Sequence, residues 1–310
     1  MNSPFTHVPL RKKIKMFRSI ALKDITSIAA QNFLQHTVAP RPICFASTID
    51  TDGNVNLSPF SFFNLFSTNP AIIVFSPSRR GRDNTTKHTL QNILEVPEVV
   101  VNIVSYHMLQ QVSLSSCEFA KGVDEFIKTG FTKEPSQIVK PPRVKESPVQ
   151  LECKVLEVKP LGTEGGAGNL VIAEVLMMHI NENILDENGN IDQKKLDLAA
   201  RLGGNWYTRA NASTIFEVEK PNTHVGIGVD ALPENIRNSK ILTGNNLGQL
   251  ANVSETPFVD PAFEDDKLKN IFQYYATDPE EMENELHLYA KELLDKGKVK
   301  EAWQVLLALN

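Results

Sequence analysis

An expected β-hairpin at residues 43–57 constrains the fold more than any other segment of the chain. An apolar run from Ile43 to Ile49 meets a turn sequence, residues 50–53, that ends in glycine. The chain then returns through Val55 and Leu57. Two strand-like runs joined by a short turn with glycine predict paired antiparallel strands. We therefore expect antiparallel sheet in this part of the molecule.

Further strands are predicted along the first two thirds of the chain. Runs rich in β-branched residues and bounded by Pro, Gly or Asn occur at residues 71–75, 98–104, 149–158 and 170–180. The expected helices between them are short, such as one from Thr86 to Leu94 with an apolar face. Many strands with few helices favour an antiparallel barrel over a doubly wound parallel sheet.

The segment that follows the hairpin mixes small polar residues with aromatic rings. Ser58, Ser61 and Asn64 alternate with Pro59 and three phenylalanines. Such a segment offers hydroxyls, backbone N–H groups and flat apolar surfaces, which suit a planar heterocycle that carries a phosphate. The pattern is typical of a flavin site. Taken alone, three phenylalanines within four positions are more typical of core packing than of a ligand site.

Several motifs, in order along the chain, resemble the flavin reductase-like family. The opening pattern of that family matches Pro-Arg-Pro-Ile at residues 40–43, Ser-Thr at 47–48 and Pro-Phe-Ser-Phe-Phe at 59–63. Further matches lie at residues 86–93, 99–102, 124–132, 141–153 and 201–207, so the resemblance covers roughly residues 20–215. His88 departs from the pattern, which usually has Asp there. The resemblance implies a mainly β (α+β) fold, an FMN-binding split β-barrel of Greek-key type with short peripheral helices.

The resemblance also implies where the phosphate of FMN would bind. The start of the Thr86 helix would offer backbone N–H groups and the positive end of the helix dipole, with hydroxyls from Thr86 and Thr89 and a charge from Lys87. Arg79 and Arg82 of the preceding loop would close the anion site. The same residues are compatible with an ordinary capped surface helix.

The flavin ring and the ribityl chain are assigned to the hairpin and the segment after it. Phe62 is expected against the ring, and Ser47, Thr48 and Asn56 against the ribityl chain or the phosphate. If the segment is one strand, Phe60 and Phe62 share a face, so not all of its rings can contact the flavin. The predicted cofactor-binding residues are Ser47, Thr48, Asn56, Ser58, Ser61, Phe62, Phe63, Asn64, Arg79, Arg82, Thr86, Lys87, Thr89 and Tyr207.

The resemblance implies an FMN-binding oxidoreductase of the flavin reductase type, with hydride transfer from NAD(P)H to the flavin and onward to an unidentified acceptor. Because the flavin carries the difficult step, we predict no catalytic residue. A homodimer with FMN near the subunit boundary is also implied. The alternatives are an FMN-binding electron-transfer or redox-sensing protein, a pyridoxamine-phosphate-oxidase-like activity on the same barrel, and an interaction protein that acts through its C-terminal end.

Composition excludes several other classes of function. The formal net charge is −5 and the only dense basic run is residues 79–82, so we expect no nucleic-acid partner. No stretch approaches the roughly 18 apolar residues of a membrane-spanning helix, so we expect no membrane association. Three widely spaced cysteines indicate neither a disulfide framework nor a zinc cluster, and the seven histidines form no metal motif. We therefore expect a cytoplasmic protein without a metal.

Four segments are predicted along the chain. Residues 1–19 form an N-terminal extension, and residues 20–220 form the FMN-binding split-barrel domain. Residues 221–269, rich in Asn, Gly, Thr and Pro, are expected to form an extended wrap or linker. Residues 270–310 are expected to form a helical hairpin, in which Asp278 caps the first helix and Gly297 ends it. This hairpin is expected to pack against the barrel or a partner subunit, or to form a docking surface.

Overall fold

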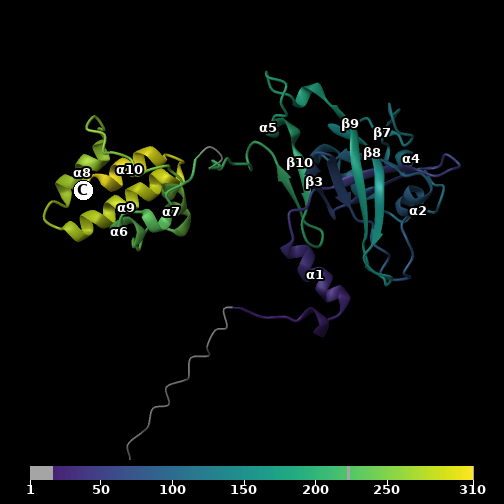
Figure 1. The fold of residues 1–310 in the computed structure, drawn as a ribbon, viewed down its shortest axis with the longest axis horizontal. Coiled ribbons are helices and arrows are strands. Elements are labelled where there is room, and N and C mark those ends of the chain that lie inside the picture. The colour runs from purple at the N-terminus through teal and green to yellow at the C-terminus, as the bar shows by residue number, and fades with distance from the viewer. Residues whose placement is uncertain (1–16, 222–223, 310) are drawn as a thin grey trace, which may run out of the picture. The chain divides into compact units, whose positions relative to one another are not determined.

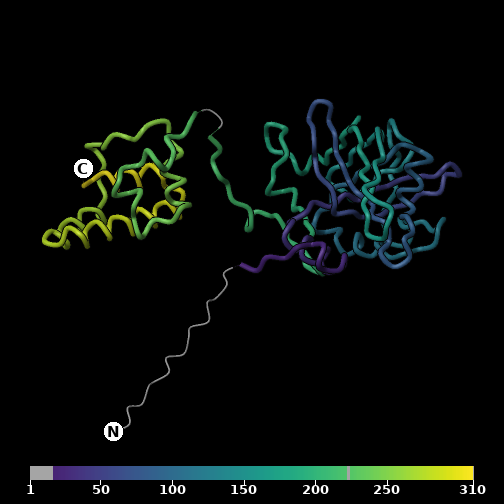
Figure 2. Tube along the Cα trace, turned by 60° about the horizontal axis from the view of Figure 1, so that its bottom comes forward, coloured from purple at the N-terminus to yellow at the C-terminus, as the bar shows by residue number. Residues whose placement is uncertain are grey.

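The computed structural model describes residues 17–221 and 224–309, and the chain divides into two compact units (Figure 1). Residues up to Phe216 belong to the first unit, and residues from Glu217 belong to the second. The path of the chain through each unit can be followed in Figure 2. Most of the predicted N-terminal extension, residues 1–16, lies outside the described residues.

The first unit is built on a seven-stranded antiparallel sheet with the strand order β2-β1-β5-β8-β9-β4-β3. This arrangement confirms the predicted strands. The bounds are β1 Cys44–Ile49, β2 Val55–Phe60, β3 Phe63–Thr68, β4 Ala71–Phe75, β5 Glu98–Ile103, β8 Val149–Pro160 and β9 Asn169–Ile180. The predicted hairpin is β1 paired with β2, and its turn is held by Asp50, whose carboxylate accepts the backbone N–H groups of Asp52 and Asn54.

The sheet must curl strongly because its two edge strands follow each other in the chain. β2 and β3 lie at opposite edges, yet only Ser61 and Phe62 join them. A flat sheet of this width would separate its edge strands by about 29 Å, whereas so short a link spans at most about 11 Å. The sheet therefore bends into a barrel that stays open between β2 and β3.

Both faces of β1 are buried, which explains its continuous apolar run. Cys44 and Ala46 point into the cluster that fills the curled sheet, together with Phe75. Phe45 points into a second cluster, where its ring lies edge-on to Phe131 at 5.3 Å between centroids. Adjacent strand residues point to opposite faces, so β1 is the shared wall of two cores.

Short elements complete the first unit. The helices are α1 Ser27–Thr37, α2 His88–Glu95, α3 Leu109–Leu114, α4 Glu125–Thr129 and α5 Gln193–Leu196, with single turns η1 Leu22–Asp24, η2 Tyr106–Met108 and η3 Glu182–Ile184. The short strands are β6 Lys133–Glu134, β7 Arg143–Val144, β10 Leu198–Arg201 and β11 Tyr207–Ala210. The predicted helix at Thr86 begins later, at His88, because the backbone of Lys87 is extended and forms the N-cap. Thr86 accepts a hydrogen bond from the Gln91 side chain instead.

A buried carboxylate on β8, that of Glu152, holds residues 137–139 by hydrogen bonds to their backbone. Glu152 is fully buried, and its oxygens accept the backbone N–H groups of Gln137, Ile138 and Val139 at 2.7–3.1 Å. The ring of His179 on β9 bonds to the same carboxylate at 2.7 Å. Burial raises the pKa of Glu152, but the hydrogen bonds from these backbone groups and from His179 outweigh burial and hold the pKa below its ordinary value.

The regular secondary structure described in the second unit is helical, and three of its helices begin within residues 221–269, so the prediction of an extended linker there is wrong. After the turn η4 Val229–Ala231 it contains α6 Glu234–Arg237, α7 Gly244–Ala251, α8 Asp266–Tyr274, α9 Pro279–Asp295 and α10 Val299–Leu307. Two of the polar residues that suggested a linker cap a helix, since Thr243 forms a capping box with Asn246 at the start of α7. Asp265 caps the next helix, α8.

The predicted C-terminal hairpin corresponds to α9 and α10. Asp278 accepts the backbone N–H of Glu281, and Gly297 adopts a positive φ of 72° after α9. The apolar faces of both helices pack against α7 and α8 in one core that includes Leu250, Leu268 and Trp303. Within the described residues of the second unit, the hairpin therefore shares one core with α6, α7 and α8, which together we call the five-helix unit.

Candidate functional site

A polar pocket lies where β2, the start of α2 and the segment between α3 and α4 meet. Four predicted residues line it: Asn56, Ser58, Lys87 and Thr89. Eight further residues, which were not predicted, complete the lining: Arg80, His88, Ser115, Ser116, Cys117, Glu118, Phe119 and Glu125. The pocket thus joins residues from four separate segments of the chain.

Hydrogen bonds between buried side chains hold α2 against the hairpin. Asn56 donates from Nδ2 to Oγ1 of Thr89 at 3.1 Å, and Asn92 donates to Oγ1 of Thr48 at 3.2 Å. All four side chains are buried. Their bonds fix the start of α2 beside β2, so the predicted residue Thr48 supports the pocket from behind instead of lining it.

The start of α2 presents positive charge to the pocket. Lys87 is the N-cap residue, and its side chain does not cap the first turn. The backbone N–H groups at a helix start and the helix dipole both favour a bound anion. Lys87, His88 and Thr89, which begin this helix, all line the pocket.

Of the three arginines in residues 79–82, Arg80 is the one that lines the pocket. Its Nη1 donates to Oγ1 of Thr85 at 2.9 Å and to the carbonyl of Thr86 at 2.6 Å, which fixes the guanidinium. Its Nε faces the carboxylate of Glu118 at 3.3 Å. The side chain of Arg80 is only 14 % exposed.

The two predicted arginines turn elsewhere, and neither lines the pocket. Arg79 donates to the side chain and carbonyl of Asn84, both at 2.6 Å. Arg82 is 68 % exposed and forms ion pairs with Asp83 and Glu118. These contacts hold the loop in shape, because Asn84 has a left-handed backbone with φ of 57°.

The titratable groups show that positive charge dominates the pocket. Burial lowers the pKa of Lys87, and Arg80 and Arg82 lower it further, although Glu118 acts in the opposite direction. Burial also lowers the pKa of His88, as do Arg80, Lys121 and Lys87. Because neighbouring cations lower the pKa of Lys87 and of His88, an added anion would offset their repulsion.

Glu125 closes the pocket from α4. Its carboxylate accepts the backbone N–H of Leu57 at 3.1 Å. Burial raises its pKa, and the hydrogen bond from Leu57 offsets part of that rise. The residue thus fixes the backbone of β2 beside the pocket.

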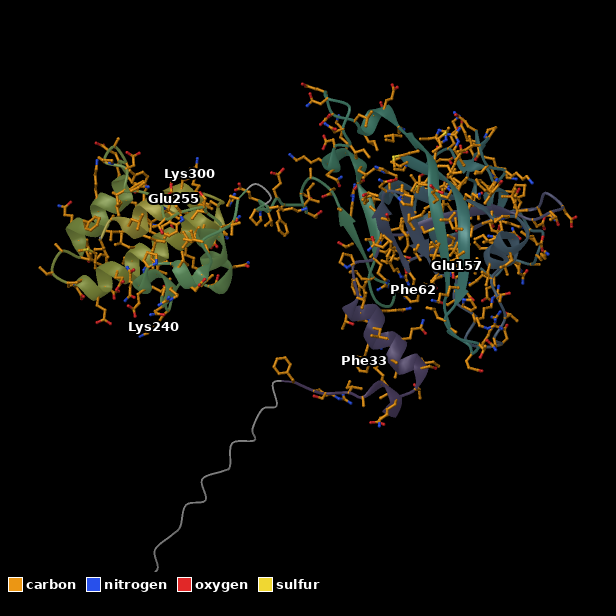
Figure 3. The ribbon with its side chains drawn as sticks, viewed as in Figure 1. Phe33, Phe62, Glu157, Lys240, Glu255 and Lys300 are labelled. Atoms are coloured by element: carbon orange, nitrogen blue, oxygen red, sulfur yellow. The ribbon has the colours of Figure 1, made fainter. Side chains whose placement is uncertain are left out.

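The predicted aromatic segment is divided between two strands and their link. β2 ends at Phe60, Ser61 and Phe62 form the link, and β3 begins at Phe63. The expectation that Phe60 and Phe62 share a strand face is therefore wrong: Phe60 is buried in the barrel core, whereas Phe62 is 43 % exposed (Figure 3). Ser61, Phe62, Phe63 and Asn64 do not line the pocket.

The remaining predicted residues do not line the pocket. Ser47 is buried beside the second core, and its Oγ has no hydrogen-bond partner among the described residues. Tyr207 on β11 accepts a hydrogen bond from Arg201, whose guanidinium lies 4.5 Å from the ring centroid. Thr86 contributes its carbonyl to Arg80 instead of lining the pocket.

No group of three or more His, Cys, Asp or Glu side chains in residues 17–221 and 224–309 is arranged to hold a metal ion. None of the helices described here is long and apolar enough to cross a membrane. All three cysteines are free, and burial raises the pKa of Cys153 to about 12.

Comparison with known proteins gives consistent matches to the first unit. The family model described as flavin reductase like domain matches residues 36–197. An uncharacterized protein of Aquifex aeolicus is 40 % identical over 173 residues, which are 56 % of this chain and 86 % of that protein. The matched residues of the family model end before the helical unit begins.

Two solved structures are similar to the chain in fold and sequence. Nitrilotriacetate monooxygenase component B from Bacillus cereus is 26 % identical with a TM-score of 0.61, over 65 % of this chain and 98 % of that one. The 2-nitrobenzoate 2-nitroreductase of Pseudomonas fluorescens is 25 % identical with a TM-score of 0.60, over 68 % of this chain and 100 % of that one. Both matches cover about two thirds of the present chain.

Proposed function

Because the chain belongs to the flavin reductase-like family of split-barrel, flavin-binding oxidoreductases, we propose that it binds FMN and is reduced by NADH or NADPH. The observation that carries the choice of FMN is the cationic pocket formed by Arg80, Lys87 and the start of α2. A phosphate monoester is the flavin group that such a pocket suits. The free cysteines are consistent with a cytoplasmic location, which we include in the proposal.

Different residues are proposed to bind the phosphate and the ring of FMN. Arg80 and Lys87 would pair with the phosphate, and the hydroxyls of Ser58 and Thr89 would donate hydrogen bonds to it. Phe62, which is exposed on the link that follows β2, is our proposed contact for the ring, with Ser61, Phe63 and Asn64 beside it. The bound flavin would supply the redox chemistry, taking a hydride from NAD(P)H and passing electrons to an acceptor. The chain's own part is to bind, to orient and to exclude water.

The absorbance spectrum of the full chain tests this function. After incubation with FMN and desalting, we expect the visible bands of a bound flavin, and we expect anaerobic NADH or NADPH to bleach them. A protein that remains colourless would contradict the proposal. A bound flavin that neither nicotinamide bleaches would favour the electron-transfer or redox-sensing alternative.

We also propose that the protein is a homodimer. Among the described residues of the first unit, α1 buries no side chain, and Phe33 on this helix is 45 % exposed (Figure 3). The edge strand β3 leaves Leu65 and Phe66 exposed at 56 % and 68 %. Exposed apolar side chains and an open strand edge favour association with a second copy.

Light scattering tests the dimer. We expect a mass of twice the 34.6 kDa chain, and we expect Phe66→Asp to weaken the dimer by about tenfold or more, because it places a charge in an apolar contact. Ile127→Asp is the control, since Ile127 is 78 % exposed on α4, a helix that packs against β2 and α3. A monomeric wild-type protein would contradict the proposal.

A further inference from the structure

One carboxylate of the chain already occupies the cationic side of the pocket. Glu118 places Oε1 3.3 Å from Nε of Arg80, and its other oxygen pairs with Arg82. A single side chain thus bridges two guanidinium groups at the place where the phosphate of FMN is proposed to bind.

The guanidinium of Arg80 has hydrogen-bond partners besides Glu118. Its Nη1 is bonded to Thr85 and to the carbonyl of Thr86, both of which belong to its own loop. Only Nε is directed to Glu118. If the carboxylate left, Arg80 would still face the pocket with an unpaired donor.

Glu118, in contrast, lies in a short segment with few backbone hydrogen bonds to other parts of the chain. It belongs to the segment between α3 and α4, whose backbone hydrogen bonds are local: Phe119 donates to Cys117 and Val123 donates to Ala120. The side chain of Glu118 is 37 % exposed. The carboxylate can therefore turn toward solvent without disturbing the core.

The charges around Glu118 favour its replacement by a stronger anion. Arg80, Arg82 and Lys87 lie on the α2 side, and Lys121 lies on its own segment. The other carboxylates nearby have different partners. Asp83 binds Thr85 and Arg82, and Glu125 accepts a hydrogen bond from the backbone of β2. One carboxylate leaves this group of cations with positive charge in excess, whereas a phosphate brings nearly two negative charges.

We infer that Glu118 is an internal counter-anion, which pairs with Arg80 and Arg82 in the flavin-free protein and is displaced by the phosphate of FMN. The inference rests on the proposed function, since it concerns the same pocket. Its physical consequence is that FMN binding exchanges one anion for another. In the flavin-free protein, Glu118 keeps the largely buried guanidinium of Arg80 paired. FMN binding is weaker by the free energy of the ion pairs of Glu118 that must break.

Calorimetric titration of the full chain with FMN and with riboflavin, which lacks the phosphate, tests the inference. We expect Glu118→Gln to bind FMN about fivefold more tightly than wild type, because the competing charge is removed without a change of shape. We expect riboflavin to bind both proteins equally. Glu134→Gln is the control: its side chain is 39 % exposed, it lies 4.0 Å from Arg143, and it is outside the pocket.

The other outcomes separate the two proposals. Equal FMN affinity of wild type and Glu118→Gln would overturn the inference and leave the flavin site standing. Weaker binding of both flavins by the variant would also overturn it, because Glu118 would then be a flavin ligand. Failure of wild type and variant alike to bind FMN would overturn the proposed function together with the inference. An unchanged thermal unfolding curve would verify that the variant is folded.

Discussion

Glu152→Ala is expected to lower the free energy of unfolding of the first unit by about 3–5 kcal/mol. The substitution removes the acceptor for three backbone N–H groups, at Gln137, Ile138 and Val139, and for the ring of His179. Glu152 is fully buried, so water cannot replace the lost bonds without opening the segment that covers β8. Hydrogen exchange should show the loss directly, as faster exchange of the amide protons of these three residues.

Lys154→Ala is the matched control, because Lys154 lies two residues along on the same strand and is exposed. We expect it to change the unfolding free energy by no more than about 0.5 kcal/mol. Comparable losses for both variants would show that the strand position, and not the carboxylate, matters.

The contribution of Glu152 should also depend on pH. Its pKa in the folded protein is held below the ordinary value, so the charged form stabilises the fold. This contribution is present in full above the unfolded pKa of about 4.3 and is lost as the pH falls through the depressed folded pKa. The difference between wild type and Glu152→Ala should therefore shrink in acid, and a difference that grows there would contradict the assignment.

Arg80→Gln is expected to weaken FMN binding by about 30-fold, with little effect on riboflavin. The guanidinium is fixed toward the pocket by Thr85 and Thr86, so it contributes a charge-assisted hydrogen bond to the phosphate at little entropic cost. Its removal also leaves Glu118 as a negative charge with one partner fewer near the phosphate. Titration calorimetry with both flavins measures the effect.

Arg82→Gln provides the control from the same basic run, since it removes the same charge. Arg82 is 68 % exposed and does not line the pocket, so we expect a change in FMN affinity of about twofold. An equal loss at both positions would indicate a diffuse electrostatic effect. A loss of riboflavin affinity in Arg80→Gln would indicate a collapsed loop instead.

The predictable parts of the fold are those that local sequence determines. The β1–β2 hairpin follows from an apolar run, a turn built on Asp50 and a glycine with φ of 86° at residue 53. Helices α6, α7 and α8 of the second unit were missed because they are short, at four, eight and nine residues. Leu250 and Leu268 become core residues only when α9 and α10 bring Leu286 and Trp303 against them, which is a contact between distant parts of the chain.

The candidate site was predictable in part for the same reason. Asn56, Ser58, Lys87 and Thr89 belong to motifs that resemble the family, and they line the pocket together. Arg79, Arg80 and Arg82 carry the same side chain, so the sequence does not distinguish them. Arg80 faces the pocket because of its contacts within the loop. Glu118 gives no signal in the sequence, because its role arises from meeting a loop some forty positions earlier in the chain.

The separate core of the five-helix unit determines where the chain can be divided. A cut at residue 270 would pass through α8 and strip Leu250 and Leu242 of the side chains that cover them. A cut between Phe216 and Glu217 would leave each apolar cluster whole, because none of the three draws side chains from both sides of that boundary. A substitution in a buried cluster on one side of that boundary therefore leaves the membership of the clusters on the other side unchanged.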